Sequence, residues 1–432
     1  MAPVTLTAQD AAALVRPTDT VGFGLGPANP HALLAALSDR DDYEDLVLGG
    51  ALLLGLFDVL ARKGVRYRCG FYGPVERLYK AKGADIQLVP AGFRQFGSVL
   101  ERFSPRVMAV QTAASDARGR LNLSLHYGAT RDELLAAGAD PNRVLICEVN
   151  AAMPRTSALE GYDNTLPLEL ADVVIEVDTA PVELPEPEVT DADERIAERC
   201  VELIAERATL QTGIGAIPSL VAAKLAEGAR GGYGVHSEMF TSGLMALHEA
   251  GKVTNDHKGQ FEGVSVTTFA LGSAELYRWL DANTQVAFGP VTVVNDPSVM
   301  RHNARLVAIN GAIEVDLYGQ VVADAVGGRQ ISGVGGHEDF VQAADLDVED
   351  RSLVCLRSTI ELGGERRSRI VARLAEGSVV STPRHHVATV VTEHGCAELA
   401  GLTVKERAVA LAAIAHPDFR EDLERAADET DA

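Results

Sequence analysis

The chain has 432 residues, of which 47% are hydrophobic, and this length predicts two large domains rather than one ordinary core. The 39 Lys and Arg residues against 61 Asp and Glu residues give a net charge of -22. Such a charge disfavours non-specific binding to nucleic acid or to an anionic membrane. A nucleotide-like anion would need local help from a few basic side chains or from backbone N–H groups in glycine-rich loops.

The N-terminus lacks the basic start and long apolar run of a secretory signal. Residues 46–57, LVLGGALLLGLF, are the most apolar stretch, but they are shorter than the roughly 20 residues that a membrane span needs. They predict a buried strand running into a helix. The cysteines show no CxxC pair and no spacing suited to zinc, which indicates reduced thiols in a cytoplasmic protein. They are Cys69, Cys147, Cys200, Cys355 and Cys396.

Apolar, strand-like runs alternate with helical patterns along the chain, as in α/β folds with largely parallel sheets. The runs are VLICEV, ADVVIEV, SVTTFAL, VAFGPVTVV, RLVAINGAIEVDL and HVATVVTE. Residues 129–138, ATRDELLAAG, predict a helix because acidic residues come early and glycine ends the segment. The predicted fold class is therefore α/β.

Residues 181–194, PVELPEPEVTDADE, contain three prolines, many acids and almost no apolar periodicity. They predict an extended, exposed linker. We place the domain boundary there, with one domain over residues 1–185 and a second over residues 186–432. The final residues, 422–432, predict an acidic helix end followed by a tail.

A weak internal repeat favours two related halves. Residues 20–37, TVGFGLGPANPHALLAAL, resemble residues 210–225, LQTGIGAIPSLVAAKL. Each combines a short apolar strand, a G-x-G turn, a proline and an amphipathic helix. The prolines are one position out of register, so chance similarity between two strand-turn-helix units remains the alternative.

The second copy of this turn, TGIGAIPS, is a candidate anion site. Gly213 and Gly215 follow the predicted strand, and Pro218 begins the next helix, so backbone N–H groups could face a ligand at close range. The loop lacks both a full GxGxxG pattern with a later acid and the Lys-Ser/Thr of a P-loop. A tight turn without a ligand is the alternative.

About 20 residues later comes GVHSEMFTSG, residues 234–243. Glu238 lies there among apolar and small residues, unlike the solvated glutamate of an ordinary helix face. Burial beside a cleft would raise its pKa and leave it reactive. A helix-capping or core-edge glutamate is the competing interpretation.

The segment ISGVGGHEDF, residues 331–340, has three glycines within four residues, Gly333, Gly335 and Gly336. Consecutive N–H groups there would suit an oxyanion hole or a pyrophosphate cradle, and a simple turn is the alternative. His385, His386 and His394 suggest a metal only superficially, so structural roles are expected. No G-x-S-x-G elbow and no H-E-x-x-H motif is present, which disfavours serine hydrolases and metalloproteases.

Together these segments resemble the acetyl-CoA hydrolase/transferase family, which includes 4-hydroxybutyrate CoA-transferases. The resemblance covers most of the second half of the chain and is looser in the first half. It rests on QTGIGAIPS, GVHSEMFTSGL, NGAIEVDLYGQVVAD, ISGVGGHEDF, STPRHHVATVVTEHGCAEL and AIAHPDFREDL, and on CEVNAAMPRT in the first half.

The resemblance implies two tandem open α/β domains of the CoA-transferase (NagB/RpiA-like) type, assembled as a homodimer or a higher homo-oligomer. It implies Glu238 as the nucleophile, with Gly335 and Gly336 beside the thioester. The implied coenzyme A contacts are Gly213, Ile214, Gly215, Ala216, Ile217, Gly333 and Gly336. Acyl-CoA and a short-chain carboxylate would be the substrates, with coenzyme A as co-substrate, no metal, no nucleic acid and no membrane.

Two departures from the family pattern are visible. His337 and Glu338 stand where members often carry Gln-Val, and residues 363–371, GGERRSRIV, replace a lysine-containing segment. Arg366, Arg367 or Arg369 would then serve the CoA phosphates. An acetyl-CoA hydrolase using the same glutamate, a non-catalytic acyl-CoA-binding protein and a sugar-phosphate isomerase on a related fold are the competing functions.

Overall fold

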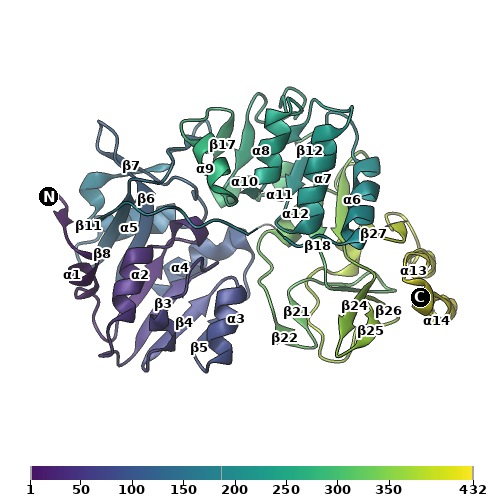
Figure 1. Cartoon of the computed structure of the whole chain (residues 1–432), viewed down its shortest axis with the longest axis horizontal. Helices are drawn as coiled ribbons and strands as arrows, with labels where there is room; N and C mark the ends of the chain where they lie inside the picture. Colours follow the sequence, from purple (N-terminus) through teal and green to yellow (C-terminus); the bar gives the residue numbers. More distant parts are fainter. Residues whose placement is uncertain (1, 186, 431–432) are drawn as a thin grey trace. The chain divides into compact units, whose positions relative to one another are not determined.

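The computed structural model describes residues 2–185 and 187–430. They form two compact units, one of residues 2–185 with 266–294 and the other of residues 187–265 with 295–430. Each unit contains an open, largely parallel sheet with flanking helices, which confirms the predicted α/β class (Figure 1). The two proposed domains differ from these units by residues 266–294.

The first unit contains an eight-stranded sheet in which every pair is parallel. In spatial order its strands are β1 (Val4–Thr5), β11 (Val173–Val177), β8 (Val144–Asn150), β6 (Val107–Ala113), β2 (Thr20–Phe23), β3 (Leu46–Gly50), β4 (Val65–Cys69) and β5 (Asp85–Leu88). Its helices are α1 (Ala8–Ala12), α2 (His31–Ser38), α3 (Pro74–Ala81), α4 (Phe96–Phe103), α5 (Arg131–Ala139), α9 (Ala274–Leu280) and α10 (Val291–Val294). Short pairs join β7 (Arg120–Asn122) to β10 (Thr165–Pro167) and β9 (Ser157–Ala158) to β17 (Val286–Phe288).

Both faces of this sheet are covered, and the central strand β6 shows why. All seven of its residues are buried. Val107 and Ala109 pack in the cluster that contains α1 and α2, whereas Met108 and Val110 pack in the cluster that contains α5. Because successive side chains point to opposite faces, a strand covered on both sides must be apolar throughout. This explains the continuous apolar runs in the sequence.

The second unit contains a six-stranded sheet that is parallel except for its last hairpin. In spatial order its strands are β13 (Gly234–Val235), β12 (Thr209–Thr212), β18 (Leu306–Gly311), β23 (Arg351–Cys355), β27 (Thr389–Thr392) and β28 (Gly395–Glu398). Its helices are α6 (Asp191–Leu203), α7 (Ala216–Glu227), α8 (Ser242–Glu249), α11 (Pro297–Met300), α12 (His337–Ala343), α13 (Val404–Ala413) and α14 (Pro417–Asp428). The remaining strands are β14 (Met239–Phe240), β15 (Ser265–Thr267), β16 (Phe269–Ala270), β19 (Glu314–Asp316), β20 (Val321–Val322), β21 (Ala325–Val326), β22 (Arg329–Gln330), β24 (Thr359–Leu362), β25 (Glu365–Ser368) and β26 (Ile370–Val371), of which β16 and most of β15 belong to the first unit.

Two local predictions were wrong in part. The strand predicted in residues 46–57 ends at Gly50, and a single 3-10 turn at Asp58–Ala61 follows in place of a helix. Two adjacent glycines and a left-handed Leu52, with φ of 50°, stop regular structure there. The linker prediction holds for the described residues up to Thr190, but the next residues form the first turn of α6. Thr190 and Asp193 make a capping box, and the acidic residues that follow Thr190 stabilise the N-terminus of the helix.

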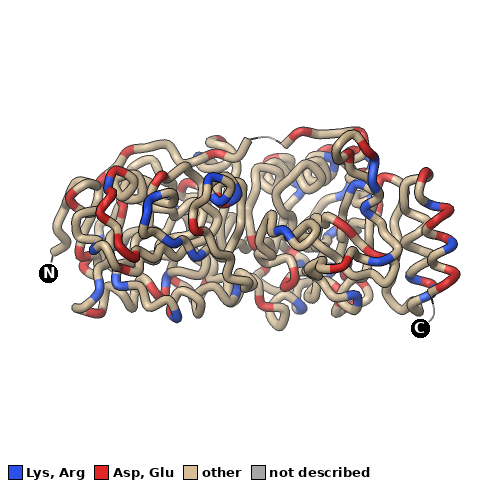
Figure 2. The backbone as a smooth tube through the Cα atoms, turned by 90° about the horizontal axis from the view of Figure 1, so that it is seen from below, with Lys and Arg blue, Asp and Glu red and all other residues tan. Residues whose placement is uncertain are grey.

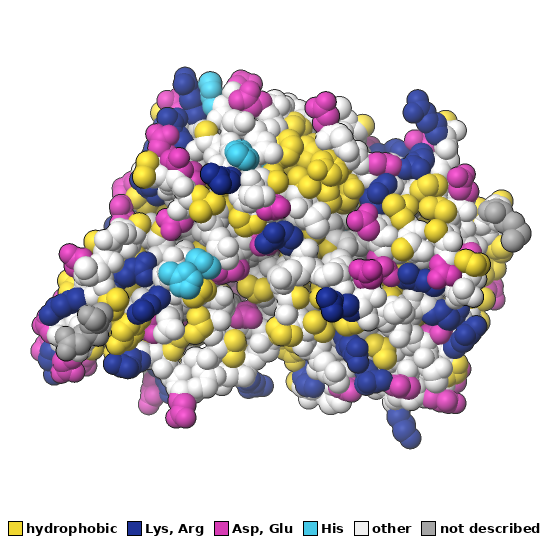
Figure 3. Space-filling view, turned by 180° about the vertical axis from the view of Figure 1, so that it is seen from behind, with side chains coloured by type: hydrophobic (Ala, Val, Ile, Leu, Met, Phe, Trp, Pro, Cys, Tyr) yellow, Lys and Arg dark blue, Asp and Glu magenta, His cyan; other side chains and the backbone are white. Residues whose placement is uncertain are grey.

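The helix predicted over residues 129–138 is α5, and α14 ends the described chain, so residues 431 and 432 of the predicted tail lie outside the described residues. Acidic and basic residues are interspersed in both units rather than gathered in one segment (Figure 2), and the face drawn in Figure 3 shows the same mixing. All five cysteines are free, and the sulfur atoms of Cys200 and Cys355 lie 3.5 Å apart. Among the described helices, none has the length and apolarity needed to span a bilayer.

Candidate active site

The segment that carries Glu238 runs along the edge of the second sheet. β13 pairs in parallel with β12, with Gly234 beside Thr209 and Val235 beside Leu210. Beyond β13, the N–H of His236 donates to the carbonyl of Leu210 at 3.1 Å. The chain then leaves the sheet, so Glu238 follows the carboxyl end of a parallel strand, where open α/β sheets bind their ligands.

The carboxylate of Glu238 is held by two other segments of the second unit. Its side chain is partly exposed, although its neighbours on both sides are buried. Asn295 Nδ2 donates to Glu238 Oε2 at 2.5 Å. A backbone hydrogen bond from Gly336 also reaches this carboxylate. Three segments that are distant in sequence thus meet at one side chain.

Gly336 approaches the carboxylate so closely that a side chain there would collide with it. A Cβ atom on Gly336 would lie 1.9 Å from Glu238 Oε2 and 2.2 Å from Asn295 Nδ2. Its φ of -97° is open to other residues, so the reason for glycine here is the contact rather than the backbone conformation. Gly336 and Glu238, both singled out in the sequence, thus lie in contact, and the role of Gly336 in catalysis remains a prediction.

Burial, with a smaller contribution from the nearby charge of Asp339, raises the pKa of Glu238 from 4.5 to about 7. The hydrogen bonds from Asn295 and Gly336 favour the charged form and act in the opposite direction. The carboxylate is therefore more basic than a solvated glutamate and still ionised at slightly alkaline pH. Such a group is a candidate nucleophile or base.

Residues 333–336 form a second glycine loop, and its other residues form the turn that places Gly336 beside Glu238. Gly335 has a φ of 56°, in the left-handed region that favours glycine. Gly336 then precedes α12, whose Phe340 and Ala343 pack against Leu306 of β18 and its neighbours. Gly333 lies partly exposed in the same turn. The thioester-side roles of Gly333 and Gly335 remain predictions.

His337 and Glu338, which form the first of the two departures from the family pattern, belong to a chain of hydrogen bonds. Thr382 Oγ1 donates to Glu338 Oε2 at 2.9 Å, so it accepts from His337 Nε2, also at 2.9 Å. His386 Nδ1 pairs with Glu338 Oε1. The chain ties the first turn of α12 to residues 382–386 and thereby supports the position of Gly336.

The first glycine loop begins beside the Glu238 segment. The N–H of Thr212, the last residue of β12, donates to Ser237 Oγ at 3.4 Å. Ser237 Oγ also lies 2.8 Å from the carbonyl of Met239, to which it donates. Because Gly213 follows Thr212 directly, the loop of residues 213–217 leaves the sheet next to the residues that flank Glu238.

This loop leaves the start of α7 uncovered by side chains of the described residues. Gly215 precedes the helix with a φ of 121°, and a Cβ atom there would meet nothing within 4 Å. The side chain of Ile214 is 53% exposed, and no described side chain caps the helix. The first N–H groups, which begin at Ala216 and Ile217, therefore remain available to an anion. Binding of coenzyme A by these residues stays a prediction.

Two residues near Glu238 were missed in the sequence. Asn295 precedes the Asp-Pro pair that starts α11, and Asp296 accepts from the N–H of Ser298 at 2.8 Å. This helix-start pattern masks the asparagine, which carries no local sign of its distant contact. Asp339 lies inside a segment that was singled out, but only the fold brings its charge close to Glu238.

The histidines form no metal centre in the described part of the chain. His394 Nε2 lies 3.6 Å from Glu393 Oε1, and its ring meets that of His416 edge-on. His386 is engaged by Glu338, as described above. Over residues 2–185 and 187–430, no group of three or more His, Cys, Asp or Glu side chains is arranged to hold a metal ion.

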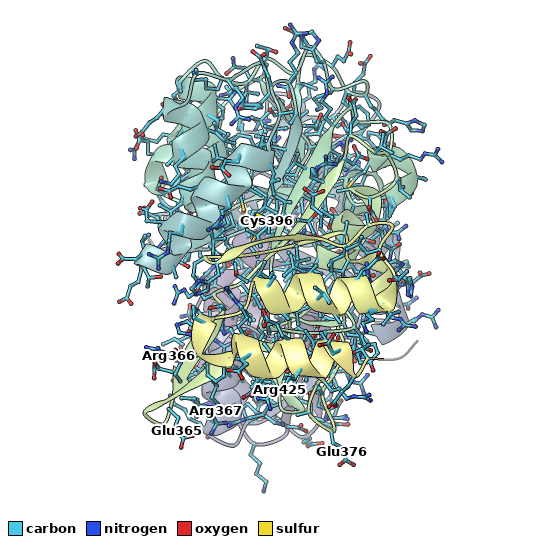
Figure 4. All side chains as sticks on the ribbon, turned by 90° about the vertical axis from the view of Figure 1, so that its right-hand side faces the viewer. Glu365, Arg366, Arg367, Glu376, Cys396 and Arg425 are labelled. Atoms are coloured by element: carbon cyan, nitrogen blue, oxygen red, sulfur yellow. The ribbon has the colours of Figure 1, made fainter. Side chains whose placement is uncertain are left out.

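The three candidate arginines differ in their surroundings. Arg366 and Arg367 lie on the β24–β25 hairpin near α14 (Figure 4), where Arg366 pairs with Asp418 at 3.2 Å and Arg367 with Glu365 at 3.3 Å. Burial lowers the pKa of Arg369, whose Nε has no hydrogen-bond partner among the described residues. Arg369 is thus the one of the three whose guanidinium is not engaged by an ion pair that the structure shows.

Fold and site together show an α/β protein in which Glu238, a carboxylate of raised pKa held by two donors, follows the carboxyl end of a parallel strand. Residues 272–427 match the acetyl-CoA hydrolase/transferase C-terminal domain. The chain is 34% identical over 425 residues to a 4-hydroxybutyrate coenzyme A transferase of Clostridium kluyveri, covering 97% of this chain and 96% of that protein. It is 31% identical to a butyryl-CoA:acetate CoA-transferase of Anaerostipes caccae, covering 96% and 94%.

The crystal structure of RipA from Yersinia pestis superposes with a TM-score of 0.89 at 29% identity, covering 98% of this chain and 97% of that one. The chain therefore belongs to the acetyl-CoA hydrolase/transferase family, as the sequence motifs indicated. It is an enzyme of the CoA-transferase type, in a family that also contains hydrolases.

Proposed function

We propose that this enzyme moves coenzyme A between short-chain carboxylic acids, acetate being one of them, through a glutamyl-CoA thioester on Glu238. The held carboxylate of Glu238 carries this proposal. Asn295 and Gly336 both donate to it, and its pKa lies near neutrality. The names of the relatives support the substrate class, because those proteins transfer CoA to or from acetate, butyrate and 4-hydroxybutyrate.

In the first half of the reaction, a carboxylate oxygen of Glu238 attacks the carbonyl of the donor thioester. The C–S bond breaks, which gives a mixed anhydride and CoA thiolate. The thiolate then attacks the side-chain carbonyl carbon of Glu238 and expels the donor acid as its carboxylate. The products are a glutamyl-CoA thioester and the first free acid, so the energy of the thioester is kept.

In the second half, the acceptor carboxylate attacks the glutamyl thioester and releases CoA thiolate. The thiolate attacks the acceptor carbonyl, forms the new acyl-CoA and returns Glu238 as a carboxylate. Each attack on the Glu238 carbonyl places negative charge on the side-chain oxygen. Asn295 Nδ2, 2.5 Å from Oε2, and the backbone donor at Gly336 already donate to this side chain and would stabilise the tetrahedral species.

Mass spectrometry of the enzyme after incubation with acetyl-CoA tests the covalent intermediate. We expect a CoA thioester on the peptide that contains Glu238; borohydride should reduce it to the alcohol and hydroxylamine should convert it to the hydroxamate, each with release of CoA. The Glu238→Gln variant is the matched control and should remain unmodified. Absence of the adduct from active wild-type enzyme would remove the proposed intermediate.

Hydrolysis by the same glutamate is the alternative, because water in place of a carboxylate would release CoA from the same intermediate. Transfer requires that water be excluded from the anhydride and the thioester. Acetyl-CoA should be consumed slowly alone and faster when butyrate or succinate is added, with acetate and butyryl-CoA or succinyl-CoA as the products and no net release of free CoA. Equal rates with and without a carboxylate would identify a hydrolase.

Several finer features belong to the same proposal. Residues 213–217 would bind coenzyme A through the start of α7, and Gly333, Gly335 and Gly336 would line the thioester. Residues 1–185 and 186–432 would act as the two domains of a cytoplasmic homodimer or higher homo-oligomer. Light scattering on the purified full-length enzyme measures the oligomer size.

The rate of the first half-reaction should depend on pH through Glu238. Since the nucleophile must be ionised and burial raises its pKa to about 7, kcat/KM for acetyl-CoA should rise with pH and level off above about 7. Below that value the rate should fall about tenfold per pH unit. Stopped-flow measurement between pH 5 and about 9 gives this profile. A flat profile would mean that another step or group controls the rate.

Replacing Asn295 by Ala should lower kcat by about 100-fold, because one of the two donors to the glutamyl oxygen is lost. The apparent pKa of Glu238 should also rise, since the Asn295 hydrogen bond favours the charged form. Steady-state kinetics over the same pH range measures both effects. A lower kcat without any change in the pH profile would argue that the asparagine acts only on folding.

A further inference from the structure

The strand that leads to Glu238 lies at the sheet edge, and its outward backbone groups meet side chains in place of another strand. Gly234 and His236 face inward, since their N–H groups donate to the carbonyls of Ala208 and Leu210. Val235 between them faces outward. Its N–H donates to Asn255 Oδ1 at 2.9 Å, and its carbonyl accepts from Lys258 Nζ, also at 2.9 Å.

Lys258 is a buried lysine whose known partners are backbone carbonyls. Its side chain has no solvent exposure, and Nζ also donates to the carbonyl of Val264 at 2.7 Å. Its own carbonyl accepts from the N–H of Ala304 at 2.6 Å, so the backbone at Lys258 is anchored as well. Burying an ammonium group is costly, and desolvation lowers the pKa of Lys258 to about 7. A lysine that only stabilised the protein surface would keep its ammonium group in water.

The strand is shaped to admit this side chain. A Cβ atom on Gly234 would lie 2.2 Å from Lys258 Cγ, so glycine leaves the space that the lysine stem fills. Asn255 has a left-handed φ of 61°, and its amide nitrogen lies 3.2 Å from Ser265 Oγ. His248 Nε2 lies 2.9 Å from the same hydroxyl. Both side chains that hold Val235 are therefore themselves fixed.

We propose that Lys258, with Asn255, is a positioning residue for the nucleophile. Val235 comes three residues before Glu238, and fixing both its N–H and its carbonyl sets where the chain leaves the sheet. The carboxylate then meets Asn295 and Gly336 at the right distance. The inference rests on the proposed function of Glu238, because a reacting group must be placed more precisely than folding alone requires. A displacement of about 1 Å at a reacting atom can cost about 100-fold in rate.

The test compares Lys258→Met with Lys252→Met in the full-length enzyme. Methionine keeps the apolar stem of Lys258 and removes both N–H contacts. Lys252 is a matched control, because its Nζ donates to the carbonyl of Gly228 at 2.5 Å, away from the strand. We expect kcat of Lys258→Met to fall by about 30-fold or more with KM for acetyl-CoA changed less than about twofold. Lys252→Met should keep wild-type kcat.

Hydrogen exchange gives a readout that does not depend on activity. Peptides covering residues 234–240 should exchange faster than wild type in Lys258→Met and at the wild-type rate in Lys252→Met. The other strands of the second sheet should stay protected in both variants. If Lys258→Met does not fold, Asn255→Gly replaces it, because glycine keeps the left-handed backbone and removes the acceptor for Val235 together with the contact to Ser265. Loss of kcat with KM retained is then expected again.

The two proposals can fail separately. If wild-type enzyme forms no CoA adduct at Glu238, the proposed function fails and the positioning role falls with it. If wild-type enzyme forms the adduct and Lys258→Met forms it at the same rate, only the positioning role is refuted. A fall in kcat that is matched in Lys252→Met would also refute it, since general destabilisation would then explain both.

Discussion

Glu238→Gln is expected to lower kcat by about 1,000-fold or more, with the fold intact. Gln keeps the size of the side chain and can still accept from Asn295, but its amide cannot attack a thioester. Steady-state CoA transfer, measured with circular dichroism on the same sample, separates loss of chemistry from loss of structure. Glu238→Asp should also lose most activity, because the carboxylate is drawn back by one methylene from both donors.

The same variant makes a prediction about stability. The native state binds the proton of Glu238 more tightly than the unfolded chain, with a pKa of about 7 against 4.5. The stability of wild-type protein that comes from this group is fully present below pH 4.5 and is lost as the pH rises to about 7. Glu238→Gln escapes this loss and should be more stable than wild type at pH 8, by about 3 kcal/mol at most.

Urea denaturation of both proteins at pH 4.5 and pH 8 measures this difference. The advantage of the variant should grow with pH over that interval. A variant less stable than wild type at pH 8 would contradict this prediction. It would show that the hydrogen bonds to the charged carboxylate stabilise the fold by more than the cost of burying that charge.

Gly336→Ala is expected to lower kcat by about 100-fold or more. The new methyl group would overlap Glu238 Oε2 at 1.9 Å and Asn295 Nδ2 at 2.2 Å, so the carboxylate and its donor must move apart. Because the φ of -97° suits alanine, the loss cannot come from backbone strain. The adduct assay and steady-state kinetics measure the effect.

Gly231→Ala is a suitable control in the same unit. Its nearest atom to a new Cβ is Lys252 Cδ at 3.5 Å, an ordinary contact, and its backbone is not left-handed. This variant should retain wild-type kcat. Wild-type activity in Gly336→Ala would contradict the contact between the second glycine loop and Glu238.

Local sequence patterns predicted the features that depend on neighbouring residues. The apolar runs around Val144–Asn150 and Val173–Val177 became parallel strands of the first sheet, because a strand covered on both faces needs apolar residues along most of its length. Residues 213–215 became a strand-to-helix turn with a left-handed Gly215, which is a local requirement, although α7 begins at Ala216, two residues before the predicted start at Pro218. The helix expected after Gly50 failed for a local reason as well, since Leu52 adopts a left-handed conformation.

The motifs around Glu238 also allowed the family to be assigned from the sequence, and with it came the proposal that Glu238 is the nucleophile. The residues of this motif are contiguous in the sequence, so the motif can be identified without the structure. What the sequence could not supply was the partners of that carboxylate. Asn295 lies 57 positions from Glu238, inside an ordinary helix-start pattern, and nothing near it indicates a contact.

Tertiary structure decided the pKa of Glu238, the closeness of Gly336 and the burial of Lys258. Each depends on distance between segments that only folding brings together. Desolvation, Coulomb interaction and steric overlap all act through space, and periodicity along the chain carries no measure of that space. From the amino acids alone came the α/β class, the family and Glu238 as the candidate nucleophile; from the fold came the surroundings that raise the pKa of this glutamate.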